Sequence, residues 1–97
     1  MPAYMIFLRE GEIGDHAAME RYQNANRKPY PGLEKLKPLV VYGAMETLEG
    51  EDADGVVVLE FPSLEDAKTW YYSDEYQAAL KDRQQAAHYR VFMVEGL

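Results

Sequence analysis

The sequence predicts an α+β fold in which helices cover one face of a four-stranded antiparallel sheet. Four short apolar segments alternate with segments of helical periodicity in the order β-α-β-β-α-β. No repeat, linker or low-complexity stretch divides the 97 residues, so we expect a single domain, residues 1–97. This order of elements is typical of the ferredoxin-like arrangement, the split βαβ motif.

The first half of the chain predicts one strand, one helix and one short turn. Ala3–Leu8 is apolar at both odd and even positions, which indicates a strand covered on both sides. Asp15 is a suitable N-cap for a helix that ends before Pro29. Leu33–Lys37 is ambiguous and is compatible with a single helical turn. The apolar positions of the helix keep the 3.6-residue period: Ala18, Met19, Tyr22 and Ala25.

A hairpin is predicted in the middle of the chain. Pro38–Leu48 has the composition of a strand, with Gly43 as a bulge or a point of close approach. The acidic segment Glu49–Asp54 reads as a solvated turn. Val56–Phe61 would then pair with the preceding strand in antiparallel fashion, and Pro62 ends it.

Two helices and a last strand complete the prediction. Ser63 and Asp66 have the spacing of a capping box, which marks the start of a helix. Ser73 repeats this start signal and predicts a second helix from Asp74 to about Ala87. The final strand is expected at Tyr89–Glu95.

Composition excludes several classes of function. A net charge of −7 argues against binding to nucleic acid or to anionic membranes. The absence of cysteine excludes disulfides and thiol nucleophiles, and two histidines are too few for a typical zinc site. Both serines read as helix caps, so a serine nucleophile is not expected. We therefore expect neither a metal nor another cofactor. No apolar run has the length of a membrane span or the form of a signal peptide, so we expect a cytoplasmic protein.

The strands predict self-association. Helices can cover only one face of the sheet, yet at least three strands are apolar on both faces. The other face, carrying Val57, Leu59 and Phe61 or their neighbours, would expose an extended apolar patch. We expect a second copy of the chain to bury it, in a homodimer whose two sheets pack face to face and close into a barrel.

Arg83 is the main candidate for a ligand-binding residue. It lies on the same helical stripe as Tyr76, Ala79 and Leu80, which is expected to face the core. A buried guanidinium needs an acidic partner or an anionic ligand. Glu60, a carboxylate in an otherwise apolar strand, is the obvious internal partner. Two interpretations remain open: a structural Arg83–Glu60 ion pair, or an arginine that holds a substrate carboxylate.

Aromatic residues and one histidine are further candidates. Several aromatic residues could line a ligand pocket together with Arg83 and Glu60, or could be ordinary core residues: Tyr22, Tyr42, Trp70, Tyr72 and Tyr76. His88 follows the last helix, where a histidine commonly contacts the helix dipole. It is a candidate general base only because imidazole titrates near neutrality. Glu60 and His88 are therefore the only candidate catalytic residues.

The second half of the chain resembles a known bacterial family. The stretch EFPSLEDAKTWYYSDEYQAALKDRQQAA, followed by a strand that ends in VEG, is similar to the family called domain of unknown function 1330. The resemblance implies the dimeric α+β barrel superfamily, whose members include monooxygenases, dismutases and decarboxylase-like proteins, and it implies no particular reaction. The turn Pro29–Pro31 and the long N-terminal loop are less typical of the family. The matching residues are Glu60, Phe61, Pro62, Ser63, Trp70, Tyr71, Ser73, Glu75, Tyr76, Gln77, Arg83, Val94, Glu95 and Gly96.

Three classes of function remain open from the sequence. The first is a cofactor-independent enzyme that acts on a small aromatic or carboxylate metabolite. The second is a ligand-binding or accessory module with the same pocket and no chemistry. The third is a purely structural dimer with a filled interior.

Overall fold

The computed structural model describes residues 1–97, and its four strands form one sheet in the order β2-β3-β1-β4. Each neighbouring pair of strands is antiparallel. The predicted ferredoxin-like βαββαβ arrangement is confirmed, with the first and third strands in the centre. The elements are β1 (Ala3–Glu10), α1 (His16–Ala25), a 3₁₀ turn η1 (Leu33–Lys35), β2 (Lys37–Val41), β3 (Gly55–Phe61), α2 (Leu64–Tyr71), α3 (Asp74–Ala86) and β4 (His88–Glu95).

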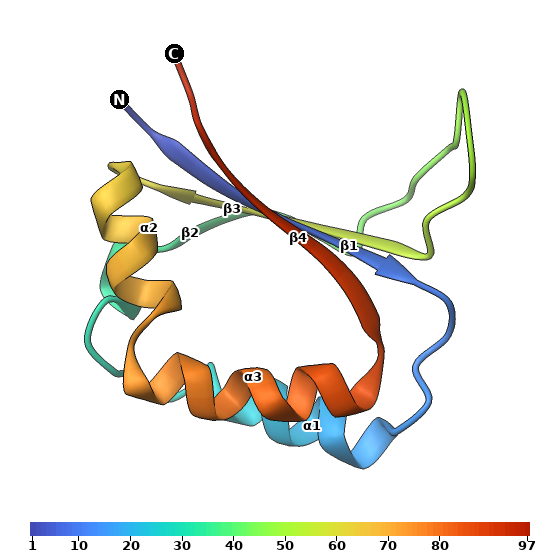
Figure 1. The fold of residues 1–97 in the computed structure, drawn as a ribbon, viewed down its shortest axis with the longest axis horizontal. Coiled ribbons are helices and arrows are strands. Elements are labelled where there is room, and N and C mark those ends of the chain that lie inside the picture. Colours follow the sequence, from blue (N-terminus) through green and yellow to red (C-terminus); the bar gives the residue numbers. More distant parts are fainter.

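All three α-helices lie on one face of the sheet (Figure 1). α1 and α3 run side by side below the strands, and α2 covers one end of the sheet. The core lies between these layers because alternate residues of β1 and β3 point toward the helices. Its buried side chains are Ala3, Met5 and Phe7 from β1, Leu59 and Phe61 from β3, and Ala67, Trp70, Tyr76 and Leu80 from α2 and α3.

The helix-free face of the sheet carries the other set of alternating residues. Leu59 and Phe61 belong to the helix-side core, as do Val57 and its partner Phe7. The apolar patch expected on the open face is therefore made by their neighbours, because successive residues of a strand point to opposite faces. Its members are only partly covered or exposed: Ile6, Leu8, Val40, Val56, Val58, Phe92 and Val94.

The predicted helix caps form. The Asp15 carboxylate accepts a hydrogen bond from the Ala18 N–H at 3.0 Å. The Ser63 hydroxyl accepts one from the Asp66 N–H at 3.1 Å and donates to the Asp66 carboxylate at 3.0 Å. The Ser73 hydroxyl accepts from a backbone N–H in the first turn of α3. Each cap satisfies backbone donors that a helix start leaves unpaired, which explains why the sequence located these starts correctly.

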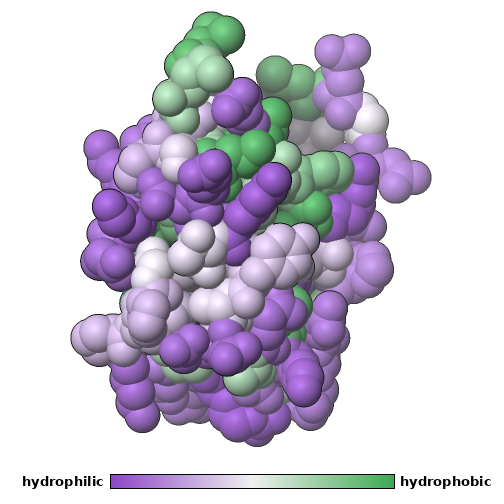
Figure 2. Space-filling view, turned by 60° about the vertical axis from the view of Figure 1, so that its left-hand side comes forward, coloured by the Kyte–Doolittle hydropathy of each residue, from purple (hydrophilic) through white to green (hydrophobic).

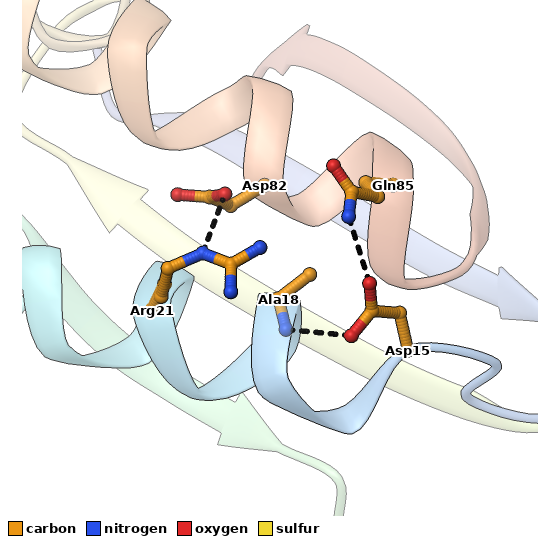
Figure 3. Close-up of polar contacts among 5 residues, drawn as sticks. All are labelled: Asp15, Ala18, Arg21, Asp82 and Gln85. Atoms are coloured by element: carbon orange, nitrogen blue, oxygen red, sulfur yellow. Dashed lines mark hydrogen bonds and ion pairs between the residues drawn. The ribbon is translucent and has the colours of Figure 1, made fainter.

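Polar side chains join α1 to α3 on their outer surface (Figure 3). The Arg21 Nε lies 3.1 Å from a carboxylate oxygen of Asp82. At the start of α1, the Gln85 side-chain amide donates to the second carboxylate oxygen of Asp15 at 2.7 Å. The Ala18 and Gln85 hydrogen bonds both stabilise the charged carboxylate and lower the pKa of Asp15. These contacts hold α1 against α3, and both helices contribute residues to the cavity described below.

The second strand is shorter than predicted. It spans Lys37–Val41 in place of Pro38–Leu48, and it pairs with β3 as the predicted hairpin requires. The irregularity in its register falls between Pro38 and Val40, so the bulge expected at Gly43 is wrong. Tyr42 ends the strand because its φ of 52° lies in the left-handed region. The rest of the connection to β3 projects away from the helices (Figure 1).

Apolar surface gathers at the level of the sheet. Over the end of the molecule that carries α2, Figure 2 shows apolar residues in the upper part and hydrophilic residues in the lower part, where α1 and α3 lie. No helix has the length and apolar character needed to cross a membrane.

Candidate ligand pocket

A cavity of about 460 Å³ lies between α1 and the β2–β3 side of the sheet. Eleven of the 16 residues that line it are hydrophobic. The strand register shows which residues lie at each end of the cavity. Leu33, Leu36 and Trp70 lie near the end of β3 that carries Leu59, whereas Tyr42 and Tyr89 lie near the end that carries Gly55. A volume of this size is within the usual range for small-molecule sites.

Arg83 brings a buried positive charge into this cavity. It lies on the predicted core-facing stripe of α3 and is only 4% exposed. Its guanidinium carbon is 5.4 Å from the centre of the Phe7 ring and 5.0 Å from that of Tyr89. Its Nε is buried and has no hydrogen-bond partner, and neither of the two ion pairs in the structure includes it. The cavity is therefore lined by a guanidinium that has no ion-pair partner and whose Nε–H has no hydrogen-bond partner.

Two pairs of tyrosines flank Arg83. The hydroxyls of Tyr22 and Tyr76 are 2.9 Å apart, and those of Tyr42 and Tyr89 are 2.6 Å apart. Burial raises the pKa of Tyr22, Tyr76 and Tyr89, and the nearby charge of Arg83 opposes this only in part. These three phenols are neutral at physiological pH and are available as hydrogen-bond donors or acceptors.

Trp70 closes the opposite end of the cavity. Its ring centre is 4.0 Å from that of Tyr76 and 5.4 Å from that of Phe61. Its indole N–H donates to the Tyr30 hydroxyl at 2.9 Å, and that hydroxyl donates to the Asn26 side-chain oxygen at 2.6 Å. Burial raises the pKa of Tyr30 to about 12. Because these polar atoms are paired with one another, this end of the cavity presents mainly apolar ring surface.

Glu60 does not meet Arg83, so the expected ion pair does not form. In β3 it is in register with Tyr4 and Lys37, and it alternates with Leu59, whose side chain packs under the helices. Glu60 therefore faces the helix-free side of the sheet while Arg83 lies on the helix side. The sequence identified two unusual charges but could not show that the two-residue period of the strand separates them.

The other predicted site residues divide between the cavity and its surroundings. Trp70 and Tyr42 line the cavity together with Arg83. Tyr76 is fully buried behind it, and only its partner Tyr22 reaches the lining. Tyr72 is 69% exposed directly after the end of α2. His88 is exposed at the start of β4, where it is in register with Glu10, so neither it nor Tyr72 contributes to this cavity.

Sequence reasoning missed Tyr89, Leu33 and Leu36 as lining residues. The alternation of β4 was a usable signal for Tyr89, since it lies on the same side as Val91 and Met93. No comparable signal exists for the two leucines, which reach the cavity through an irregular connection. The cavity is lined by no aspartate, glutamate or histidine. Its chemistry is consequently that of hydrogen-bond donors and of two arginines, the buried Arg83 and the exposed Arg27.

The comparison with family models assigns the chain to a family. The model described as "Domain of unknown function (DUF1330)" matches residues 2–97, so the chain belongs to that family. This agrees with the resemblance seen in the sequence. No curated protein matches the sequence.

Several solved structures share the fold. A protein of unknown function from Rhodopseudomonas palustris is 24% identical, with a TM-score of 0.66 over 99% of this chain and 82% of that one. A dimeric protein of unknown function and ferredoxin-like fold from Bacteroides fragilis is 17% identical, with a TM-score of 0.63 over 98% and 96%. An ethyl tert-butyl ether d (ethd) family protein from Bacillus halodurans is 20% identical, with a TM-score of 0.66 over the whole of both chains. At these identities the likeness establishes the fold and no activity.

Proposed function

We propose that this protein binds a small organic carboxylate in the cavity beside Arg83. The observation that supports this proposal is the buried guanidinium of Arg83, which lines a cavity of about 460 Å³, has no ion-pair partner and has no hydrogen bond at Nε. A guanidinium keeps its charge in proteins, and burying it without a counter-charge costs several kcal/mol. A carboxylate ligand would supply the missing charge and accept the free hydrogen bond.

The lining also suggests how the ligand is oriented. Arg83 and the Tyr42–Tyr89 pair lie at one end of the cavity, so the carboxylate belongs there. Toward the other end the walls are Leu33, Leu36 and the ring of Trp70, which favour a flat apolar body. The ligand class is therefore a carboxylic acid with an aromatic or aliphatic body.

Binding is better supported than acid–base catalysis. Removal of a proton requires a base, and the cavity is lined by no carboxylate or imidazole. Its phenols stay protonated because burial raises the pKa of Tyr22 and Tyr89. The groups at hand can hold an anion or stabilise negative charge on a bound molecule. The interior is not filled by side chains, which argues against a purely structural role.

The single tryptophan provides the assay. Trp70 lines the cavity and is the only tryptophan of the chain, so its fluorescence reports directly on occupancy. We expect benzoate to quench or shift this emission saturably and to bind more tightly than benzamide, which has the same shape and no charge. Arg83→Met should weaken benzoate binding at least about tenfold, because a hydrogen bond to a charged group is worth about 1.5–3 kcal/mol.

Arg21→Met is the matched control, since it removes an arginine that is exposed on α1 and pairs with Asp82. It should bind benzoate as the wild type does. Equal affinity of the wild type and Arg83→Met for benzoate would refute the proposal. So would the absence of saturable binding of benzoate, cyclohexanecarboxylate and 2-naphthoate at millimolar concentrations. Mass spectrometry of small molecules that copurify with the protein would identify the natural ligand.

We also propose that two copies of the chain associate through the helix-free face of the sheet. This face presents Phe92 and Val94, which are exposed, beside the partly covered Ile6 and Val58. A contiguous apolar patch of this kind is typical of an interface, and a second copy offers the complementary surface. A cytoplasmic location, expected from the sequence, stays a prediction.

The association is tested by sedimentation equilibrium at micromolar concentration. We expect twice the chain mass of 11.1 kDa. Val58→Asp should shift the protein to monomer, because it places a charge in the middle of the proposed interface. Leu48→Asp is the control, since Leu48 is 84% exposed on the β2–β3 connection and lies outside this face. A wild-type mass of one chain would refute the proposal.

A further inference from the structure

The Tyr42–Tyr89 pair occupies one end of the sheet on its helix side. Arg9 of β1 is in register with Gly55 of β3 and with Tyr89 of β4, and Tyr42 follows the last residue of β2. Arg9, Gly55 and Tyr89 therefore form one row across β3, β1 and β4, whereas Tyr42 follows Val41, the partner of Val57, and bonds to the Val56 carbonyl. The two tyrosines reach over this row from opposite edges, and their hydroxyls meet at 2.6 Å.

The backbone of Tyr42 is in a conformation that a bulky residue rarely adopts. Its φ is 52°, and it is the only residue other than glycine with a positive φ. Such a conformation persists only where the surroundings hold it, and it is often found at functional sites. Here the Tyr42 N–H still donates to the Val56 carbonyl at 2.9 Å, so the strand pairing continues while the side chain turns inward.

Gly55 makes room for the turned ring. A Cβ atom at this position would lie 2.7 Å from Cδ1 and 2.9 Å from Cε1 of Tyr42, both closer than real Cβ contacts. On the other side, the Arg9 guanidinium lies 5.4 Å from the ring centre and is itself fixed by the carbonyls of Asp54 and Gly11. The Tyr42 ring thus lies between Gly55 and the hydrogen-bonded guanidinium of Arg9, and its hydroxyl contacts that of Tyr89.

One of the two hydroxyl protons of the Tyr42–Tyr89 pair is free to donate a hydrogen bond. Each phenol carries one proton, and a single hydrogen bond between them uses only one of the two. Neither hydroxyl has another hydrogen bond in the structure. Tyr89 also contacts Arg83, whose guanidinium carbon is 5.0 Å from the centre of the Tyr89 ring. The hydroxyl pair and the Arg83 guanidinium consequently line the same part of the cavity.

We propose that the Tyr42–Tyr89 hydroxyl pair forms the second half of the carboxylate site, and that Gly55 is the positioning residue that keeps this pair in place. The proposal rests on the carboxylate-binding function inferred above. One carboxylate oxygen accepts from Arg83 and the other accepts from the spare phenol proton. A neutral donor adds selectivity for an oxyanion without adding a further positive charge to the site.

The experiment compares benzoate and benzamide by isothermal titration in a set of variants. Tyr42→Phe and Tyr89→Phe each remove one hydroxyl and keep the ring, and the double variant removes both. We expect the ratio of benzoate to benzamide affinity to fall about five- to tenfold in the double variant, because a charge-assisted hydrogen bond is about twice as strong as a neutral one. The single variant with the larger loss identifies the hydroxyl that faces the ligand.

Gly55→Ala tests the positioning role while it keeps both hydroxyls. The new Cβ should displace the Tyr42 ring, and the benzoate to benzamide ratio should fall as it does in the phenylalanine variants. Gly43→Ala is the matched control, because its Cβ would meet nothing closer than the Val40 Cγ1 at 4.0 Å. An unchanged ratio in Gly55→Ala would overturn the role of Gly55.

The outcomes separate this inference from the function on which it rests. If Arg83→Met does not weaken benzoate binding, the proposed function fails. If Arg83→Met weakens it and the double phenylalanine variant keeps the wild-type ratio, only the role of the tyrosine pair fails. An equal loss of benzoate and benzamide affinity in the double variant would mean that the two hydroxyls only support the wall of the cavity, which also overturns the inference.

Discussion

Arg83→Met should fold and, without ligand, should be more stable than the wild type. The structure gives the reason, since Arg83 is 4% exposed and has neither an acidic partner nor a hydrogen bond at Nε. Burying a charge without a partner is costly, and replacing it by an apolar side chain of similar length is often stabilising. Methionine has this length and adapts to irregular space.

The expected gain is the difference between two opposing contributions. The unpaired charge costs several kcal/mol in the folded state. The contacts of the guanidinium with the rings of Phe7 and Tyr89, at 5.4 and 5.0 Å, return about 1–2 kcal/mol each when they are shielded from water. We expect Arg83→Met to raise the free energy of unfolding by about 1–3 kcal/mol. For a domain of this size each kcal/mol raises the melting temperature by about 4–8 °C.

Urea unfolding, followed by circular dichroism, measures this difference with and without benzoate. The ligand stabilises the wild type by RT ln(1 + [L]/Kd), about 2.7 kcal/mol at a hundred times Kd. At the same benzoate concentration it should stabilise Arg83→Met by no more than about 1.4 kcal/mol, because the variant binds at least about tenfold more weakly. The difference in the free energy of unfolding between Arg83→Met and the wild type should therefore shrink or change sign as benzoate is added. Arg21→Met, whose side chain is 53% exposed, should differ from the wild type by about 1 kcal/mol or less in either condition.

A loss of stability would refute this reasoning. If Arg83→Met without ligand is less stable than the wild type by more than about 1 kcal/mol, the guanidinium contributes to the fold and is not an unsatisfied ligand-binding group. Equal stabilisation of the wild type and Arg83→Met by benzoate would show that the ligand does not contact this residue.

Three further predictions follow from the geometry. Glu60→Gln should leave benzoate affinity within about twofold and the free energy of unfolding within about 0.5 kcal/mol, because Glu60 is on the opposite face of the sheet. A tenfold change in benzoate affinity, measured by Trp70 fluorescence, would contradict this placement. Ser63→Ala should cost about 1 kcal/mol in urea unfolding through loss of the α2 cap, while benzoate binding is kept. The free energy of unfolding should be constant up to about pH 10 and should fall as the pH rises toward about 12. The reason is that the pKa of Tyr30 is 10.0 in the unfolded chain and about 12 in the folded protein. A decline that is complete below pH 9 would contradict this expectation.

Local signals account for the parts of the fold that the sequence predicted well. The caps at Asp15, Ser63 and Ser73 each depend on a side chain and a backbone N–H three residues away, so they are visible in a short window of sequence. The buried stripe of α3 follows from helical periodicity in the same way. The end of β2 was predicted too late, because the turn at Tyr42 depends on Gly55 and Tyr89, which are distant in the sequence.

The sequence by itself determined the element order, the strand order, the two-sided apolar character of the sheet and the buried position of Arg83. These follow from periodicity and from the hydrophobic effect, which act on neighbouring residues. Only the tertiary structure decided which charges and aromatic rings share a space. The strand period places Glu60 away from Arg83, whereas the register of four strands brings Tyr42 and Tyr89 together beside it. Whether two side chains contact one another depends on the direction in which each leaves the sheet, and composition and spacing along the chain do not specify that direction.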